Sequence, residues 1–226
     1  MNMIVDNLQR VTERIVESAG RVGKDPTGIK LIAVTKGVEI SNILEALRTD
    51  VHTIGENRVQ EAKIKYTQIK DKVESLQVDW HLIGHLQRNK VKDAVEIFSL
   101  IHSVDSLELA KEIDKRAAQI GKIQDILIEV NTSGEKSKLG ITPAELENLL
   151  LIIEPLANVR VQGLMTIAPF VAEPEDARPY FRMLKELNDE FRLKYLSMGM
   201  SNDFEIAIEE GANLLRIGRA IFGNII

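Results

Sequence analysis

Residues 31–37 read LIAVTKG, a short apolar run that ends in a single lysine and a glycine. A strand buried on both faces of a parallel sheet has such a continuous apolar run, whereas a strand with one wet face alternates. Eight runs of this kind recur along the chain, and several of the stretches between them are amphipathic with helical spacing. The predicted strands are residues 29–35, 52–55, 80–84, 99–104, 125–131, 159–167, 195–199 and 214–218.

The alternation of strands and helices predicts βα units and a parallel sheet. Eight such units favour a single α/β domain with a closed (β/α)8, or TIM, barrel, and an open doubly wound sheet is the alternative. No GxGxxG motif follows any predicted strand, which disfavours the dinucleotide-binding form of that alternative. The clearest helices are expected at residues 40–48, 59–73, 106–120 and 143–156.

An extra helix is expected before the first strand. An apolar stripe at helical spacing runs through this N-terminal segment and comprises Ile4, Leu8, Val11, Ile15 and Val16. Charged residues interrupt the segment, so it lacks the unbroken apolar core of a signal peptide.

The composition narrows the class of protein. The chain has 226 residues, a net charge of −5, no cysteine and 44% hydrophobic residues. A mildly acidic chain is a poor candidate for binding nucleic acid, and no apolar run approaches the roughly 20 residues of a membrane span. We therefore expect one domain over residues 1–226 in the cytoplasm, with neither nucleic acid nor membrane as a partner.

Lys36 is the strongest candidate for a reactive residue, because it follows the first predicted strand and barrel active sites lie at the carboxyl ends of the strands. A lysine that is partly desolvated in a barrel mouth has a lowered pKa and supplies the neutral amine that forms a Schiff base with a carbonyl. The simpler alternative is a lysine whose stem packs on the strand end while its ammonium lies in water.

The last two strands end in segments that are typical of a phosphate site. Residues 197–203 read SMGMSND and precede a helix, and residues 216–223 read RIGRAIFG. Loops after strands seven and eight form the usual phosphate site of such barrels. The alternative for the first segment is an ordinary helix start capped by Ser201 or Asn202. A lysine opposite a phosphate site suits an aldehyde that carries a phosphate, and pyridoxal 5′-phosphate (PLP) is the obvious candidate.

Two other groups have weaker functional interpretations. The four histidines lack a carboxylate partner at metal-site spacing, so we interpret them as structural or pocket-lining and expect no metal site. The segment NTSGEKSKLG, residues 131–140, is either a solvated loop or a mobile flap that binds anions.

Seven motifs carry a resemblance over nearly the whole chain: GENRVQEA, WHLIGHLQRNK, SVDS, VNTSGEKSKLG, GLMTIAP, SMGMSND and RIGRAIFG. With these motifs in this order, the chain resembles the YggS/PROSC family of PLP homeostasis proteins. The resemblance implies a single barrel like the N-terminal domain of alanine racemases, without their second, β-rich domain.

The same resemblance implies the residues of a cofactor site. Lys36 would hold PLP as a Schiff base, with Asn57 and Met165 near the cofactor. Arg216 would face the pyridine nitrogen and, because it stays charged, would leave the ring a weak electron sink. The phosphate side would comprise Met200, Ser201, Gly218 and Arg219.

Two functions follow from these assignments. The first is a PLP carrier that buffers the cofactor or delivers it to apo-enzymes, without catalytic residues and as a monomer or weak dimer. The second is an amino-acid racemase or related PLP enzyme, which needs a base on each face of the substrate. Tyr66 and Tyr180 are expected in helices and Tyr195 at the start of a strand, away from the mouth, which favours the carrier. A third possibility is a sugar-phosphate barrel enzyme that uses Lys36 for a Schiff base.

Overall fold

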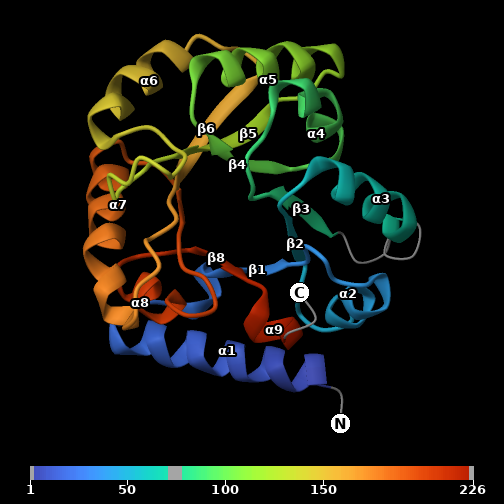
Figure 1. Ribbon diagram of the computed structural model, residues 1–226, viewed down its shortest axis with the longest axis vertical. Helices are drawn as coiled ribbons and strands as arrows, with labels where there is room; N and C mark the ends of the chain where they lie inside the picture. Colours follow the sequence, from blue (N-terminus) through green and yellow to red (C-terminus); the bar gives the residue numbers. More distant parts are fainter. Residues whose placement is uncertain (1–2, 71–77, 224–226) are drawn as a thin grey trace.

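The computed structural model describes residues 3–70 and 78–223, and within these ranges eight parallel strands form a closed barrel (Figure 1). Each strand pairs with the next along the chain, and the first pairs with the last from Lys30–Leu214 to Ala33–Ile217. The strands are β1 (Lys30–Val34), β2 (Thr53–Glu56), β3 (Asp79–Leu82), β4 (Leu100–Val104), β5 (Gln124–Glu129), β6 (Val159–Met165), β7 (Tyr195–Ser197) and β8 (Leu214–Ile217).

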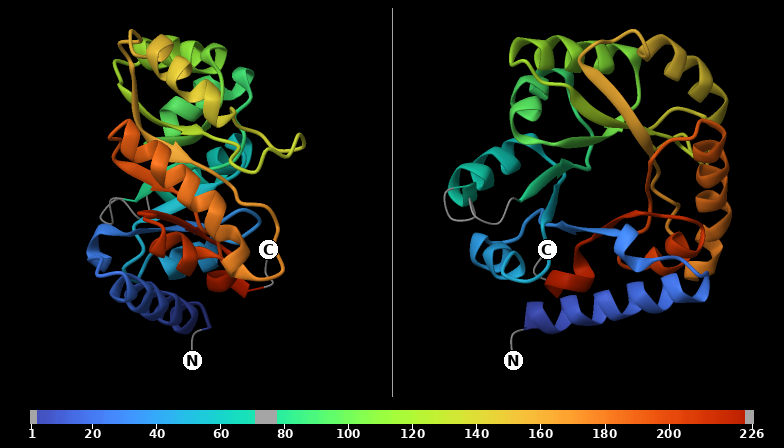
Figure 2. Two further views of the ribbon diagram at one scale, coloured as in Figure 1. Left: turned by 90° about the vertical axis from the view of Figure 1, so that its left-hand side faces the viewer. Right: turned by 180° about the vertical axis from the view of Figure 1, so that it is seen from behind.

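Helices surround the barrel on its outside, so that each strand is buried between the helices and the barrel interior (Figures 1 and 2). The α-helices are α1 (Met3–Arg21), α2 (Ile40–Ala46), α3 (Val59–Ile69), α4 (Val91–Ile97), α5 (Leu107–Gln119), α6 (Leu146–Ile153), α7 (Arg178–Glu190), α8 (Phe204–Glu209) and α9 (Arg219–Phe222). Short 3₁₀ turns are η1 (Pro26–Gly28), η4 (Arg88–Lys90), η5 (Pro143–Glu145) and η6 (Pro174–Ala177).

The predicted barrel is confirmed, and the open sheet is excluded because β1 and β8 are hydrogen-bonded to one another. Every predicted strand is present, and its ends differ from the observed ones by no more than two residues. The predicted helices are present as well, although the end of the helix expected at 59–73 lies outside the described residues after position 70.

A layer of apolar side chains fills the inside of the barrel and is separate from the larger core between strands and helices. It consists of Ile32, Leu100, Leu127, Met165 and Leu214. Branched and long side chains from the strands fill barrels in this way, which makes the interior a packed core rather than a pore. Polar chemistry is therefore confined to the mouth and to the few polar side chains that enter the interior.

The extra helix, α1, lies along the outside of the barrel next to α8 and α9 (Figure 1). Four of the five predicted apolar positions of its stripe are buried, but Val16 is 49% exposed. The prediction was wrong for Val16 because Val16 follows Ile15 by about 100° of helical rotation and so points past the buried face. No helix within residues 3–70 and 78–223 is both long and apolar enough to cross a membrane.

Candidate functional site

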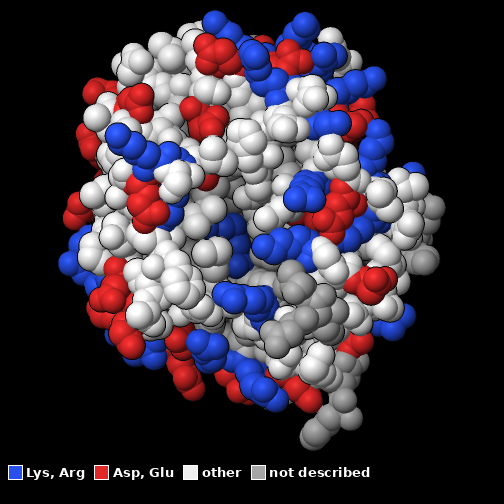
Figure 3. All heavy atoms as spheres, viewed as in Figure 1, with Lys and Arg blue, Asp and Glu red and all other residues white. Residues whose placement is uncertain are grey.

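A cavity of about 930 Å³ opens at the carboxyl ends of the strands. Seven of the eight residues predicted for the cofactor site line it, namely Lys36, Asn57, Met200, Ser201, Arg216, Gly218 and Arg219. On this face Lys and Arg side chains gather around a central depression, although the chain as a whole is acidic (Figure 3). The cavity therefore offers a positively charged environment that suits an anion.

Lys36 follows the last residues of β1 and lies in a tight turn at the cavity wall. Val38 N–H donates a hydrogen bond to Thr35 O at 3.0 Å, and Gly37 between them has a φ of +70°. Only glycine adopts this left-handed conformation without strain, and a Cβ would otherwise meet open space there. The strand within LIAVTKG thus ends at Val34, and the turn that starts at Thr35 places Lys36 at the border of the cavity.

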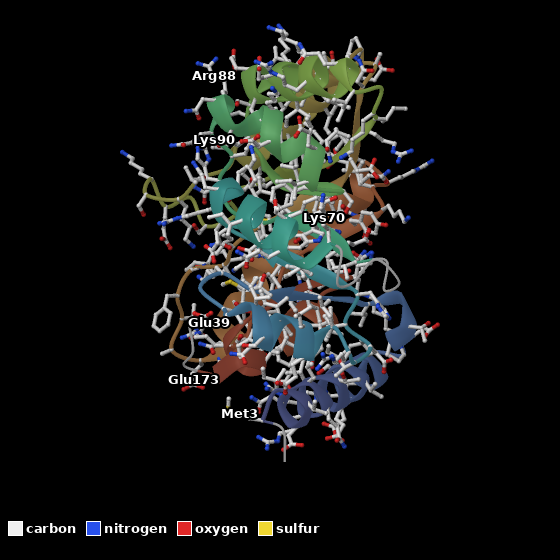
Figure 4. All side chains as sticks on the ribbon, turned by 90° about the vertical axis from the view of Figure 1, so that its right-hand side faces the viewer. Met3, Glu39, Lys70, Arg88, Lys90 and Glu173 are labelled. Carbon is white, nitrogen blue, oxygen red and sulfur yellow. The ribbon has the colours of Figure 1, made fainter. Side chains whose placement is uncertain are left out.

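The environment of Lys36 differs from the one expected from the sequence. Lys36 is exposed rather than partly desolvated, although it also lines the cavity. Glu39, which follows the turn, and Glu173, which ends the loop after β6, lie on the same side of the barrel (Figure 4). The amine is therefore accessible to a small molecule that enters the mouth.

Asn57 is placed by a close approach of two strand ends. It follows β2 directly, and a Cβ on Gly84, just after β3, would lie 2.3 Å from Asn57 O. Only a residue without a side chain fits here. The carbonyl of Gly84 also accepts the hydroxyl of Ser103 at 2.7 Å, which fixes the ends of β2, β3 and β4 against one another.

The segments after β7 and β8 meet on the other side of the cavity. Ser201 Oγ accepts a hydrogen bond from Ala220 N–H at 3.2 Å, so its own O–H remains able to donate. Neither Ser201 nor Asn202 caps α8, because that helix begins after Asp203. The carboxylate of Asp203 instead accepts Met200 N–H at 2.6 Å and holds the loop. The capped-helix interpretation of SMGMSND is therefore wrong in its choice of cap.

Arg216 projects from β8 into the barrel and is buried, although it also borders the cavity. Its Nη1 donates to Ser197 Oγ at 2.6 Å and its Nη2 donates to Thr166 O at 2.8 Å. Burial lowers the pKa of Arg216 to about 10, opposed by the carboxylates of Asp203 and Glu129. The guanidinium therefore remains charged at neutral pH and is held by two strand-end partners.

Met165, the eighth predicted residue, does not line the cavity. It is fully buried in the apolar layer inside the barrel. The last residue of β6 points into the barrel, and the loop beyond it, from Ile167 to Pro174, borders the cavity instead. A hydrophobic residue at a strand end gives no sequence signal for whether it faces the mouth or the packed interior.

The cavity also contains residues that the sequence did not single out, among them Arg14, Ile83 and Phe170. Arg14 comes from α1, where it pairs with Glu205 and lies 4.5 Å from the ring centre of Phe204. A charge on the polar face of an N-terminal helix looks like any solvated residue, so no sequence signal marks it. Phe170 is 92% exposed on the loop after β6, and a single aromatic residue in a predicted loop is the sequence signal that could have marked it.

The segment 131–140 combines features of both interpretations that the sequence left open. Its tip, from Gly134 to Ser137, is exposed. Lys138, however, borders the cavity and donates to Ile167 O at 3.2 Å. This segment and the loop after β6 project from the same end of the barrel (Figure 2, left). The segment thus adds a cation to the mouth.

Two of the four histidines form part of the barrel interior, and none lies among the cavity-lining residues that the structure describes. His102 Nδ1 is 2.8 Å from Ser197 Oγ, and His102 Nε2 is 3.0 Å from His81 Nδ1. Burial, with the nearby charge of Lys30, lowers the pKa of His81 to about 3. Burial also lowers the pKa of His102 well below its ordinary value, so both rings are neutral. Both rings are buried and lie outside the cavity lining, and a structural role for them stays a prediction. In the described parts of the chain, no three His, Cys, Asp or Glu residues are grouped to hold a metal ion.

Glu129 is a buried carboxyl group near the cavity that the sequence did not point to. It ends β5 and is 5% exposed. Burial and the nearby carboxylate of Asp105 raise its pKa to about 7, against the opposing charge of Arg216. A substantial fraction of Glu129 therefore carries a proton at neutral pH.

The fold and the site define a class of protein. A parallel barrel carries a lysine after its first strand, and this lysine shares one cavity with the loops after the last two strands. Residues 7–225 match the family model described as alanine racemase, N-terminal domain, and the chain belongs to this family. An alanine racemase of Clostridium difficile 630 shares the fold, with a TM-score of 0.73 and 15% identity, and the likeness covers 96% of this chain but 56% of that one.

Closer relatives narrow the class. A pyridoxal phosphate homeostasis protein of Aquifex aeolicus (strain VF5) is 47% identical over 224 residues, which is 96% of each chain. The structure of PipY from Synechococcus elongatus PCC7942, solved with PLP bound, has a TM-score of 0.80 and 35% identity and covers 94% of this chain and 100% of that one. The chain belongs to the pyridoxal phosphate homeostasis protein family, which confirms the resemblance seen in the sequence motifs.

Proposed function

We propose that this chain binds PLP by covalent attachment to Lys36 Nζ and functions as a carrier that buffers the cofactor or delivers it to apo-enzymes. The observation that carries the proposal is that Lys36 and the phosphate-side residues Ser201, Gly218 and Arg219 line one cavity. The name of the relatives in this family and the PLP bound to PipY support the same cofactor.

The residues present fit PLP. The cavity volume of about 930 Å³ lies in the range of small-molecule sites. A phosphate dianion suits the free hydroxyl donor of Ser201 and the exposed cation of Arg219. When bound, PLP supplies an aldehyde that reacts with amines. The accessible amine of Lys36 is the group that would take up this aldehyde, and Asn57 borders the same space.

Arg216 supports a carrier rather than an efficient catalyst. It is charged, and a guanidinium keeps its own protons at neutral pH. A pyridine nitrogen that faces it would remain unprotonated, whereas an acidic partner there would supply the positive charge on which most PLP catalysis depends. Ser197 and Thr166 hold the guanidinium in place and leave it little freedom to move aside.

The positions of other candidate bases also support a carrier. Tyr66 and Tyr180 lie in α3 and α7, and Tyr195 is the first residue of β7. No tyrosine, histidine or cysteine occurs among the cavity-lining residues of the described chain. Lys138 remains a second amine in the cavity, and burial lowers its pKa. A racemase that uses Lys138 as the second base beside Lys36 is the specific alternative to test.

A borohydride reduction of the protein with stoichiometric PLP tests the attachment. Peptide mass spectrometry should find one reduced pyridoxyl phosphate group on Lys36, and Lys36→Ala should lose it while retaining the unfolding temperature of the wild type. A label that persists elsewhere in Lys36→Ala would refute the assignment. Racemisation assays with alanine and other amino acids should show no turnover at rates typical of enzymes, and a rate that falls in Lys138→Gln would favour the racemase.

The remaining parts of the proposal concern the whole chain. We propose that residues 1–226 act as one PLP-binding domain in the cytoplasm, as a monomer or weak dimer. Apo forms of PLP-dependent enzymes are the proposed recipients. Transfer from the reconstituted carrier to an apo-enzyme, faster than release of PLP into solution, would support direct delivery.

A further inference from the structure

An ionic cluster with two buried members and one partly exposed member lies beside the turn that carries Lys36, outside the lining of the cavity. It consists of Glu56 at the end of β2 and of Glu61 and Lys65 on α3, and we call it the turn clamp. Lys65 Nζ donates to Glu56 Oε1 at 2.9 Å and to Glu61 Oε1 at 2.6 Å. Its side chain is 8% exposed and that of Glu56 is fully buried.

The turn clamp forms hydrogen bonds with the residues on both sides of Lys36. On the preceding side, Lys65 Nζ donates to Thr35 O at 2.5 Å, and Thr35 Oγ1 donates to Glu56 Oε1 at 2.5 Å. On the following side, Gly37 N–H donates to Glu61 Oε1 at 2.7 Å. The three donors of the Lys65 ammonium are all used, so its position is fully specified.

Stability alone does not account for this cluster. A buried ion pair is costly to desolvate and is often no more stabilising than apolar residues of the same volume. Burial raises the pKa of Glu56 despite its bonds to Lys65 and Thr35, and its Oε2 has no hydrogen-bond partner. An arrangement with this cost is better explained by what it positions. Fixed backbone geometry around a reactive side chain gives such a benefit.

We propose that Lys65, held between Glu56 and Glu61, is a positioning residue that fixes the turn from Thr35 to Gly37 and so directs the Lys36 amine into the cavity. The inference deepens the proposed function and rests on it. A merely structural cluster would join α3 to the barrel, and its loss would lower stability without a specific effect on PLP capture.

Two variants weaken the clamp to different degrees. Glu61→Gln keeps the shape of a partly exposed side chain but removes the charge that bridges Lys65 and Gly37. The double variant Glu56→Gln/Lys65→Met removes both buried charges together, so neither is left unpaired. The matched control is Lys63→Met, on the same helix, which breaks the exposed pair with Asp93 at 2.7 Å.

The experiment measures the rate at which PLP attaches to Lys36, by absorbance after rapid mixing and by mass spectrometry after borohydride reduction. The acylation rate of Lys36 by a small N-hydroxysuccinimide ester is measured without PLP, together with the unfolding temperature. We expect Glu61→Gln and the double variant to slow PLP attachment by about tenfold, which is less than the roughly 100-fold loss that a misplacement of about 1 Å can cause. Acylation of the exposed amine should change by less than about twofold, and Lys63→Met should match the wild type in every readout.

The outcomes are distinguishable. Wild-type attachment rates in Glu61→Gln and in the double variant would overturn the inference, and so would an equal loss in Lys63→Met. If the double variant does not fold, Glu61→Gln alone decides. If the wild type itself takes up no PLP on Lys36, the proposed function fails and the inference fails with it.

Discussion

Arg216 Nη1 donates a hydrogen bond of 2.6 Å to Ser197 Oγ, and this contact sets the direction of a buried chain of hydrogen bonds across the barrel. A guanidinium has donors only, so the Ser197 oxygen is an acceptor in this contact. The Ser197 hydroxyl is then free to donate to His102 Nδ1 at 2.8 Å. The opposite arrangement would leave this buried hydroxyl proton without an acceptor, which costs about 1–3 kcal/mol.

The same argument fixes the tautomers of both buried histidines. Because His102 accepts at Nδ1, it carries its proton on Nε2 and donates to His81 Nδ1 at 3.0 Å. His81 then carries its own proton on Nε2. Arg216 is thus hydrogen-bonded to a chain of neutral groups formed by Ser197, His102 and His81. Neither histidine adds a second positive charge beside the guanidinium.

Replacing Ser197 should loosen Arg216. Ser197→Ala leaves Arg216 Nη1 and His102 Nδ1 without their shared partner, so we expect a loss of about 1–3 kcal/mol in the free energy of unfolding. We also expect several-fold weaker PLP binding and a shifted absorbance band of bound PLP, because the charge near the ring would move. Denaturant titration and PLP titration measure these effects. Ser106→Ala, at a hydroxyl with only a 3.3 Å contact to Asp105, is the control and should change neither.

Removing the hydroxyl of Ser201 should weaken PLP retention without abolishing attachment to Lys36. The hydroxyl offers one donor to a phosphate, and a hydrogen bond to a charged group is worth about 1.5–3 kcal/mol. Ser201→Ala should therefore raise the dissociation constant of PLP by roughly tenfold or more. Equilibrium dialysis measures this constant, and borohydride labelling of Lys36 should persist at saturating PLP. An unchanged constant would remove Ser201 from the phosphate site.

The raised pKa of Glu129 makes a contribution to stability that depends on pH. In the folded protein Glu129 keeps its proton up to a pH of about 7, whereas the unfolded chain releases it near the ordinary value of 4.5. The folded state binds the proton more tightly, so this contribution is fully present below pH 4.5 and is lost as the pH rises through 7. Between pH 5 and pH 8, the free energy of unfolding of Glu129→Gln should therefore rise by roughly 2 kcal/mol relative to that of the wild type.

Free energies of unfolding at both pH values, from denaturant titration, test the role of Glu129. Glu147→Gln, at an exposed position of α6, is the control and should track the wild type at each pH. A difference between Glu129→Gln and the wild type that stays constant from pH 5 to pH 8 would show that this carboxyl group does not titrate in that range.

The close approach at Gly84 should not tolerate a methyl group. A Cβ there would lie 2.3 Å from Asn57 O, a backbone atom that cannot rotate away. Gly84→Ala should cost about 2 kcal/mol or more of stability and weaken PLP binding, because the end of β2 must shift. Gly20→Ala, in α1 and with open space around its Cβ, is the control and should be neutral or slightly stabilising. Thermal unfolding and PLP titration separate the two variants.

Sequence patterns were sufficient for the strands, because a strand buried on both faces needs an apolar run wherever it lies. They were less informative about single side chains near the mouth. Met165 and Arg216 both occur at or near a strand end, yet one is packed in the interior and the other borders the cavity. The difference depends on which neighbours each strand meets across the barrel, and those neighbours are far away in the chain.

The sequence by itself determined the barrel, the position of Lys36 after the first strand and the two segments on the phosphate side. These features depend on local patterns: apolar runs, helical spacing and a glycine after the lysine. In the sequence, Glu61 and Lys65 look like an ordinary surface pair on a helix. Only the tertiary structure decided that they form hydrogen bonds with the turn around Lys36. It also decided that Ser197 and His102 join Arg216. These contacts join residues that lie between 19 and 95 positions apart in the chain. They depend on the packing of α3 beside the end of β1 and on side chains that meet inside the barrel, and no local pattern records such pairings.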